Sequence, residues 1–218
     1  MIPVFDLSRQ NNELKSELFD AVKEVVKGGV FILGKNVAQF AEAFARYLGV
    51  KYAVGVASGT DALSLSLLAL GIGSGDEVIL PANAYPTVFA IISIGAVPKL
   101  VDIDPATHNI DPTKIPQAIS KKTKAIIPVH LYGRPADMEE ILGVGRRYNI
   151  PIVEDCCQAH GAEIKINSRI TRISTRIDSN SHSDLFEQNS SNSRIQRPKN
   201  SLNQETTKAV WKKVGSIG

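Results

Sequence analysis

The sequence has only two cysteines, Cys156 and Cys157, and they are neighbours. Because successive side chains along a strand point to opposite faces, these two are poor candidates for a mutual disulfide, and a disulfide framework is excluded. No Cys/His spacing typical of zinc accompanies them, so we expect no metal site. The chain also lacks the glycine-rich G-x-G-x-x-G fingerprint of dinucleotide-binding folds.

Long hydrophobic runs are absent as well. The most apolar stretch, Val88–Val97, is too short to cross a membrane, and Met1–Asp6 lacks the charged start and apolar run of a signal peptide. With 43% hydrophobic and 22% charged residues, the composition is that of an ordinary globular domain. We therefore expect a cytoplasmic protein with no membrane partner.

The formal net charge of +3 is unevenly distributed. From Ile166 onward the chain has nine Lys or Arg and four Asp or Glu, so the residues before it carry a net charge of −2. The basic excess belongs to the C-terminal part, and no basic patch is interleaved with aromatic residues. Nucleic acid is therefore not an expected partner.

The spacing of apolar residues predicts an α/β fold. Residues Glu13–Lys27 and Asn36–Leu48 have apolar positions three and four apart, which predicts amphipathic helices. After Lys51, short Val/Ile-rich runs alternate with helical patterns, as in a parallel sheet covered on both faces. The predicted strands are 52–57, 77–80, 98–103, 124–129 and 152–154, and the predicted helices are 60–70, 86–94, 112–119 and 136–148.

Two loops at the starts of predicted helices could bind an anion or a flat ring. At Ser58, Gly59 and Thr60, glycine lets the backbone approach a ligand, and the hydroxyls and free N–H groups attract an anion. The simpler alternative is an ordinary turn in which Ser58 or Thr60 caps the helix. Tyr85 follows the next strand and could stack on a planar ring, or it could be a surface tyrosine at a helix start.

A third loop follows the last predicted strand, at the carboxyl edge where α/β sheets bind ligands. Asp155 there needs a partner, and a protonated heterocyclic nitrogen would serve; a helix cap or a salt bridge is the alternative. Gln158 could bond a neighbouring phenolic oxygen. His160 lies close by, although a hydrogen-bonded loop histidine is the commoner case. Asp102 and Asp104 are interpreted mainly as turn formers, with metal binding as a remote alternative.

Taken together, these segments resemble the DegT/DnrJ/StrS family of sugar aminotransferases, which use pyridoxal 5'-phosphate (PLP). The resemblance implies the fold type I large domain, a mostly parallel sheet with helices on both faces, here incomplete. The motifs occur in the family's order: Ile2–Val4, Phe31–Gly34, Phe44–Gly49, Ser58–Leu63, Gly75–Ile79, Val101–Ile103, Pro128–Gly133 and Glu154–Ala162.

The resemblance also implies roles for the loop residues. Ser58–Thr60 would contact the cofactor phosphate, and Tyr85 would stack on the pyridine ring. Asp155 would pair with the ring nitrogen, and Gln158 would bond the phenolic oxygen, with His160 as an active-site neighbour. An ionised carboxylate at the nitrogen keeps the ring protonated and able to accept electrons.

The sequence departs from the family pattern after residue 164. Lys212–Gly218 resembles a segment that the family places shortly after Glu163, and a polar stretch displaces it here. We therefore expect residues 1–164 to be the N-terminal part of the PLP-binding domain. A low-complexity, disordered insertion at 165–209 and a stub of the resumed domain at 210–218 would follow.

The second departure concerns catalysis. The family's Schiff-base lysine lies beyond the last matching segment, and Lys208, Lys212 and Lys213 fall in a different motif, so we expect no catalytic residue here and an inactive fragment. The parent would transfer an amino group from a donor such as glutamate to a nucleotide-linked keto sugar, as a homodimer. The alternatives are a sugar dehydratase of the same family that uses pyridoxamine phosphate (PMP), and a non-catalytic truncated or regulatory product.

Overall fold

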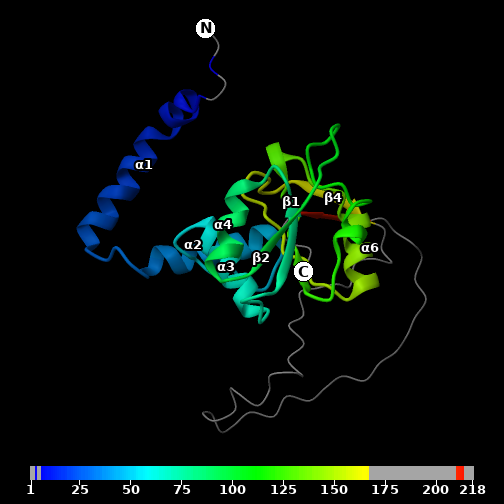
Figure 1. Cartoon of the computed structure of the whole chain (residues 1–218). Coiled ribbons are helices and arrows are strands. Elements are labelled where there is room, and N and C mark those ends of the chain that lie inside the picture. The colour runs from blue at the N-terminus through cyan, green and yellow to red at the C-terminus, as the bar shows by residue number, and fades with distance from the viewer. Residues whose placement is uncertain (1–2, 4–5, 167–209, 214–218) are drawn as a thin grey trace, which may run out of the picture. The chain divides into compact units, whose positions relative to one another are not determined.

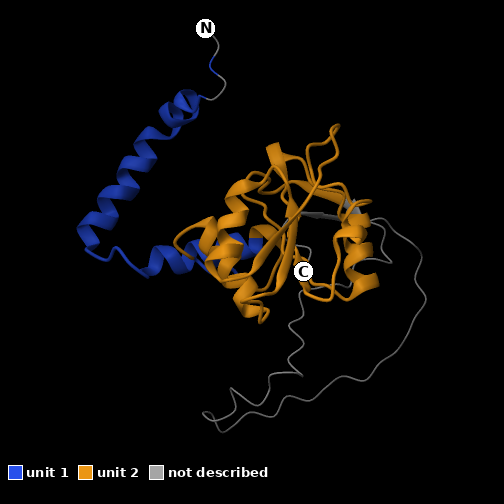
Figure 2. Ribbon diagram, viewed as in Figure 1, with its two compact units in different colours: residues 1–46, 52–55 blue, residues 47–51, 56–218 orange. Residues whose placement is uncertain are grey.

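The computed structural model describes residue 3, residues 6–166 and residues 210–213 (Figure 1). The chain divides into two compact units, coloured separately in Figure 2. Unit 1 comprises Met1–Arg46 and Tyr52–Gly55, and unit 2 comprises Tyr47–Lys51 and Val56–Gly218. No helix among the described residues is both long and apolar enough to cross a membrane.

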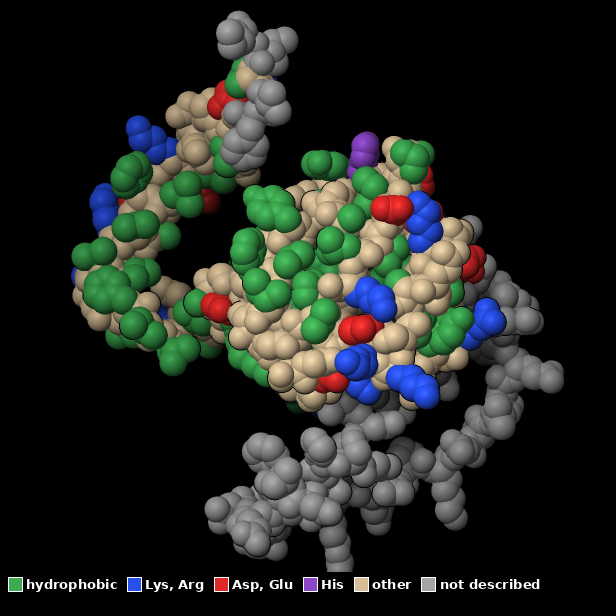
Figure 3. Space-filling model, viewed as in Figure 1, with side chains coloured by type: hydrophobic (Ala, Val, Ile, Leu, Met, Phe, Trp, Pro, Cys, Tyr) green, Lys and Arg blue, Asp and Glu red, His purple; other side chains and the backbone are tan. Residues whose placement is uncertain are grey.

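Unit 1 contains α1 (Ser8–Gly28) and most of α2 (Lys35–Leu48), both predicted from their apolar spacing. Gly29 caps the C-terminal end of α1: it has a left-handed φ of 67°, and its N–H donates to the carbonyls of Val25 and Val26. None of the α1 residues is buried, and apolar side chains of this helix are visible along its surface in Figure 3. The amphipathic pattern therefore predicted the helix correctly, but the apolar face of the helix is not buried.

Unit 2 is built on a parallel sheet. Its strands are arranged in the order β2-β1-β3, and Glu77 is paired with both Val97 and Thr123. The prediction of a parallel sheet with alternating helices is confirmed for these strands. Their bounds are β1 (Glu77–Pro81), β2 (Val97–Val101) and β3 (Thr123–Ile126).

Helices cover both faces of this sheet, as predicted. On one face, Val78 and Leu80 pack with buried residues of α3 and α4, such as Leu67 and Ile91. On the other face, Ile79 and its neighbours pack with buried residues of α5 and α6. These helices are α3 (Gly59–Ala69), α4 (Tyr85–Ser93), α5 (Ile115–Ala118) and α6 (Met138–Tyr148), and the short helix η1 spans Leu131–Gly133.

The predicted strand 152–154 forms only isolated parallel bridges, which join Ile126 to Ile152 and Val129 to Asp155. The chain is extended and hydrogen-bonded there, but Pro128 stands inside the ladder and has no N–H to donate. The hydrogen bonds that position Asp155 are therefore present, although residues 152–154 do not form a regular strand.

Two other predictions need correction. Tyr52–Ala57 forms no strand, because no described strand pairs with it, and an extended segment becomes a β-strand only against a neighbour. The helix expected at 112–119 is reduced to Ile115–Ala118. Its expected first turn is replaced by a tight turn in which the Asp111 carboxylate accepts from both the N–H and the hydroxyl of Thr113.

A two-stranded antiparallel ladder joins β4 (Glu163–Ile166) to β5 (Val210–Lys213). The register pairs Glu163 with Lys213 and Ile166 with Val210. The β4 strand thus continues two residues past the predicted domain boundary at 164. The disorder predicted within 165–209 concerns residues 167–209, which lie outside the described residues.

Candidate functional site

Asp155 lies at the carboxyl edge of the sheet, where its backbone pairs with the chain that follows β3. Its N–H donates to the carbonyl of Pro128 at 2.9 Å, and its carbonyl accepts from the N–H of His130 at 3.0 Å. Thr87 and Cys157 donate to the carboxylate. Thr87 Oγ1 donates to Oδ2 at 3.0 Å, and the N–H of Cys157 donates to Oδ1 at 3.3 Å. Because Thr87 is in the first turn of α4, the carboxylate lies beside the start of that helix.

The turn before α3 has the features of an anion site. Ser58 caps the helix, since its Oγ accepts from the N–H of Asp61 at 3.0 Å. This cap leaves the Ser58 hydroxyl hydrogen available, and the first N–H groups of a helix have no partner within it. Ser58, Gly59 and Thr60 are exposed, and a Cβ placed on Gly59 would meet nothing within 4 Å. Open space therefore adjoins these donors.

The α3 and α4 helices run in the same direction. Near their middles, Ser64 Oγ donates to the carbonyl of Ala90 at 3.0 Å. Beyond their C-terminal ends, the loops that return to β1 and β2 are joined by the N–H of Gly75, which donates to the carbonyl of Gly95 at 3.3 Å. Both helices therefore begin at the opposite edge of the sheet, the carboxyl edge that carries Asp155.

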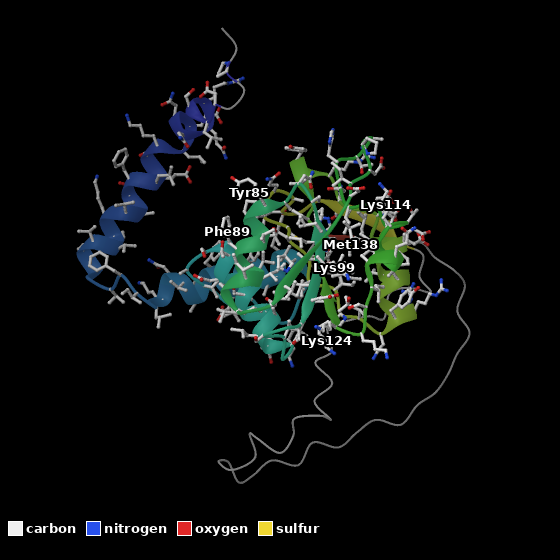
Figure 4. The ribbon with its side chains drawn as sticks, in the orientation of Figure 1. Tyr85, Phe89, Lys99, Lys114, Lys124 and Met138 are labelled. Atoms are coloured by element: carbon white, nitrogen blue, oxygen red, sulfur yellow. The ribbon has the colours of Figure 1, made fainter. Side chains whose placement is uncertain are left out.

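Tyr85 begins α4 and is followed by Pro86, at a position that favours helix starts. The Tyr85 side chain is 71% exposed, and Figure 4 shows it on α4 together with Phe89. An uncovered ring at the carboxyl edge fits a stacking partner for a flat ligand. His160 is also exposed, in the turn that follows Gln158.

Gln158 is oriented by the backbone of Tyr132. The Tyr132 N–H donates to Oε1 of Gln158 at 2.8 Å, and Tyr132 adopts a left-handed φ of 57°. Because Oε1 is the acceptor, the side-chain NH2 lies at the other branch of the amide and has two hydrogens to donate. Gln158 is exposed, so this NH2 is accessible to an oxygen of a ligand.

The pair of buried His130 and partly buried Glu154 was missed by the sequence reasoning. His130 is fully buried; its Nδ1 accepts from the N–H of Ala136 at 2.9 Å, and its Nε2 lies 3.0 Å from Glu154 Oε2. A ring nitrogen that accepts from an amide carries no proton, so Nε2 holds the hydrogen and donates it to the carboxylate. The pair fixes the residue before Asp155. The available signal was a histidine and a carboxylate at the ends of neighbouring predicted strands.

Cys156 adds a third metal-ligating side chain to this pair, since the ligand atoms of His130, Glu154 and Cys156 lie within 4.8 Å of one another. The tautomer of His130 argues against a metal ion there. A metal would need the lone pair of Nε2, and the proton would then move to Nδ1 and face the N–H of Ala136. The cluster fits a structural hydrogen-bonded pair better than a metal site.

Both cysteine thiols remain protonated at neutral pH. Burial, with smaller effects from the charges of Glu154 and Asp155, raises the pKa of Cys156 far above its usual range. Burial, a hydrogen bond to Asp155 and the charge of that carboxylate raise the pKa of Cys157 to about 11. Neither thiol is therefore suited to act as a nucleophile.

The fold and this edge define the class of the protein: an open α/β domain whose carboxyl edge combines a helix N-terminus, an exposed aromatic ring and a hydrogen-bonded carboxylate. Residues 12–176 match the model of the DegT/DnrJ/EryC1/StrS aminotransferase family, and the chain belongs to this family. The resemblance drawn from the sequence motifs is confirmed.

Curated relatives are similar over the same region. The dTDP-3-amino-3,6-dideoxy-alpha-D-galactopyranose transaminase of Aneurinibacillus thermoaerophilus is 48% identical over 163 residues, 74% of this chain and 45% of that protein. The UDP-2-acetamido-2-deoxy-3-oxo-D-glucuronate aminotransferase of Pseudomonas aeruginosa is 42% identical, over 76% of this chain and 46% of that protein. This chain therefore spans less than half the length of these relatives.

Solved structures confirm the predicted fold and the cofactor of the family. DesV of S. venezuelae has a TM-score of 0.71 at 40% identity, over 75% of this chain and 44% of DesV. NtdA of Bacillus subtilis, solved with bound PMP, has a TM-score of 0.70 at 37% identity, over 78% of this chain and 41% of NtdA. The GDP-4-keto-6-deoxy-D-mannose-3-dehydratase of E. coli, solved with hydrated PLP, has a TM-score of 0.61 at 32% identity, over 69% of this chain and 43% of the dehydratase.

Proposed function

We propose that this chain is the N-terminal part of a PLP-dependent sugar aminotransferase and that the carboxyl edge of unit 2 binds the cofactor. The observation that carries the proposal is the shared edge of the Asp155 carboxylate and the first turn of α3. The first turn of α3 supplies hydrogen-bond donors, and the Asp155 carboxylate supplies acceptors. A donor-rich group and an acceptor-rich group at one edge suit a ligand with an anionic end and a cationic end, such as PLP or PMP with a protonated ring nitrogen.

Each residue has a role that its chemistry supports. Ser58–Thr60 anchors the phosphate through backbone N–H groups and hydroxyls, and Tyr85 covers one face of the ring. Asp155 holds the proton on the ring nitrogen, and the NH2 of Gln158 donates to the phenolic oxygen, with His160 adjoining. The bound cofactor supplies an electron sink for the substrate carbon that loses a proton.

The complete reaction is assigned to the parent protein, because this chain spans less than half of its relatives. The parent protein transfers an amino group from a donor such as glutamate to a nucleotide-linked keto sugar. Lys208, Lys212 and Lys213 do not occupy the motif of the Schiff-base lysine, so we expect no transamination by this chain alone. The homodimer and the cytoplasmic location stay predictions.

A dehydratase is the second candidate, and the E. coli dehydratase structure supports it. Its identity of 32% is lower than the 48% of the Aneurinibacillus thermoaerophilus transaminase, which favours the aminotransferase. A regulatory role is the third candidate, because a relative at 44% identity is the pleiotropic regulatory protein of Geobacillus stearothermophilus.

We also propose that the PLP-binding domain resumes at 210–218 after an insertion at 165–209. The antiparallel register of β4 with β5 supports this arrangement, because it joins the two sides of the interposed residues as a hairpin would.

Equilibrium dialysis of PMP against the 218-residue chain tests the cofactor site, because PMP binding needs no lysine. Asp155→Asn removes the charge that faces the ring nitrogen and should weaken PMP binding at least about tenfold, the effect of losing a charge-assisted hydrogen bond. Asp102→Asn is the matched control; Asp102 is exposed and paired with Lys114, and its loss should leave binding unchanged. Equal effects of the two substitutions, or no PMP binding by the unsubstituted chain, would contradict the proposal.

A further inference from the structure

The Thr87 hydroxyl has an unusual partner for a residue in the first turn of a helix. A threonine in the interior of a helix commonly bonds the carbonyl three or four residues back; for Thr87 those carbonyls belong to Ala84 and Asn83, at and before the helix start. Thr87 instead donates to Asp155 Oδ2 at 3.0 Å, across 68 residues of sequence. Its side chain is 3% exposed, so water does not compete for this hydroxyl.

The contact restricts a torsion that is otherwise loose. The terminal torsion of an aspartate is broad and roughly two-fold, so an unrestrained carboxylate samples many orientations. Here Oδ2 accepts from Thr87 and Oδ1 accepts from the N–H of Cys157, and the Cys157 thiol also bonds this carboxylate. A carboxylate has about four lone-pair sites, so a site remains for a further donor.

We propose that Thr87 is a positioning residue that fixes the Asp155 carboxylate in the orientation in which it accepts a hydrogen bond from the protonated ring nitrogen of the cofactor. This inference rests on the proposed function. Thr87 touches no part of the ligand in this role and acts through Asp155 alone. It also couples the start of α4, which carries Tyr85, to the strand end that carries the carboxylate.

A purely structural role for Thr87 makes a different prediction. If the hydroxyl only joins α4 to the sheet, its loss weakens every ligand at this edge alike. If it orients Asp155, its loss weakens only ligands that present a ring N–H. PMP and its carbon analogue, in which C–H replaces the ring nitrogen, separate the two cases.

The test measures dissociation constants of both ligands for the full chain and for two variants. Thr87→Val keeps the shape of the side chain and removes the donor, whereas Thr87→Ser keeps the donor. The preference for PMP over its carbon analogue should fall about tenfold in Thr87→Val and change less than about twofold in Thr87→Ser. Partial unfolding cancels in this ratio, because an unfolded molecule is lost to both ligands.

The outcomes separate the inference from the proposed function. An unchanged preference in Thr87→Val, or an equal loss for both ligands, overturns the role of Thr87 while the cofactor site stands. If the unsubstituted chain binds PMP no more tightly than the carbon analogue, the contact between Asp155 and the ring nitrogen is wrong. The proposed function and the role of Thr87 then fail together.

Discussion

The pairing of β4 with β5 predicts that the residues between them can be replaced by a two-residue turn. The last pair of the ladder is Ile166 with Val210, and an Asn-Gly dipeptide joins two directly opposed residues in a type I′ hairpin. The variant deletes residues 167–209 and places Asn-Gly between Ile166 and Val210, so every described residue is kept.

The expected effect follows from loop-closure entropy. The cost of closing a loop grows as (3/2)RT ln n, so a reduction from the 43 residues of 167–209 to two stabilises the chain by about 3 kcal/mol. This magnitude applies if the deleted residues make no stabilising contacts, as the insertion proposal requires. With a urea m-value of about 2 kcal/mol/M, the unfolding midpoint should rise by about 1.5 M.

Urea unfolding followed by far-UV circular dichroism measures this shift. The control replaces residues 167–209 with a Gly/Ser linker of equal length and should unfold at the same urea concentration as the parent chain. A turn variant that unfolds before the parent chain, or a linker control that loses stability, would show that residues 167–209 pack on the domain. Either result refutes the insertion.

Two further predictions concern His130 and Cys157, which lie close to Asp155 in the structure. His130→Ala should lower the free energy of unfolding by about 3 kcal/mol in thermal denaturation, because the partly buried Glu154 loses its donor. The exposed control His108→Asn should change this free energy by less than about 0.5 kcal/mol, because asparagine tolerates the left-handed backbone at this position. Similar losses in both variants would exclude a special role for the pair. The rate at which iodoacetamide alkylates Cys157 should reach half its maximum near pH 11, the raised pKa of this thiol, whereas an ordinary thiol reaches it at pH 9.0. Because the folded pKa is the higher one, stability is retained below pH 9 and falls as the pH rises towards 11; an alkylation midpoint at pH 9 would contradict this.

The sheet was predictable because most of its strands carry a local pattern. The apolar run at 77–80 predicted β1 to within one residue, and the alternation with helices gave the parallel arrangement. Tyr52–Ala57 has the same local composition and is not a strand, because pairing depends on a neighbour that those six residues do not encode. The interruption at 152–154 depends on Pro128, which lies in the adjoining segment.

The residue types of the candidate site were predictable, and their pairings were not. The order of the motifs indicated Asp155 and Gln158 as ligand-contacting residues, which stays a prediction. Their partners, Thr87 and Tyr132, lie 68 and 26 residues away, so no spacing rule connects them. The His130–Glu154 pair was hidden for the same reason, since only the register of β3 with the next segment brings the two together.

The common direction of β1, β2 and β3 has a consequence for synthesis on the ribosome. After a strand ends at the carboxyl edge, the chain passes through a helix and a further strand before it reaches that edge again. Ser58, Tyr85 and Asp155 therefore belong to successive segments of the chain. The complete carboxyl edge forms only after the last of these segments has emerged from the ribosome and docked. Under the proposed function, PLP would be retained only by chains in which all of these segments have docked.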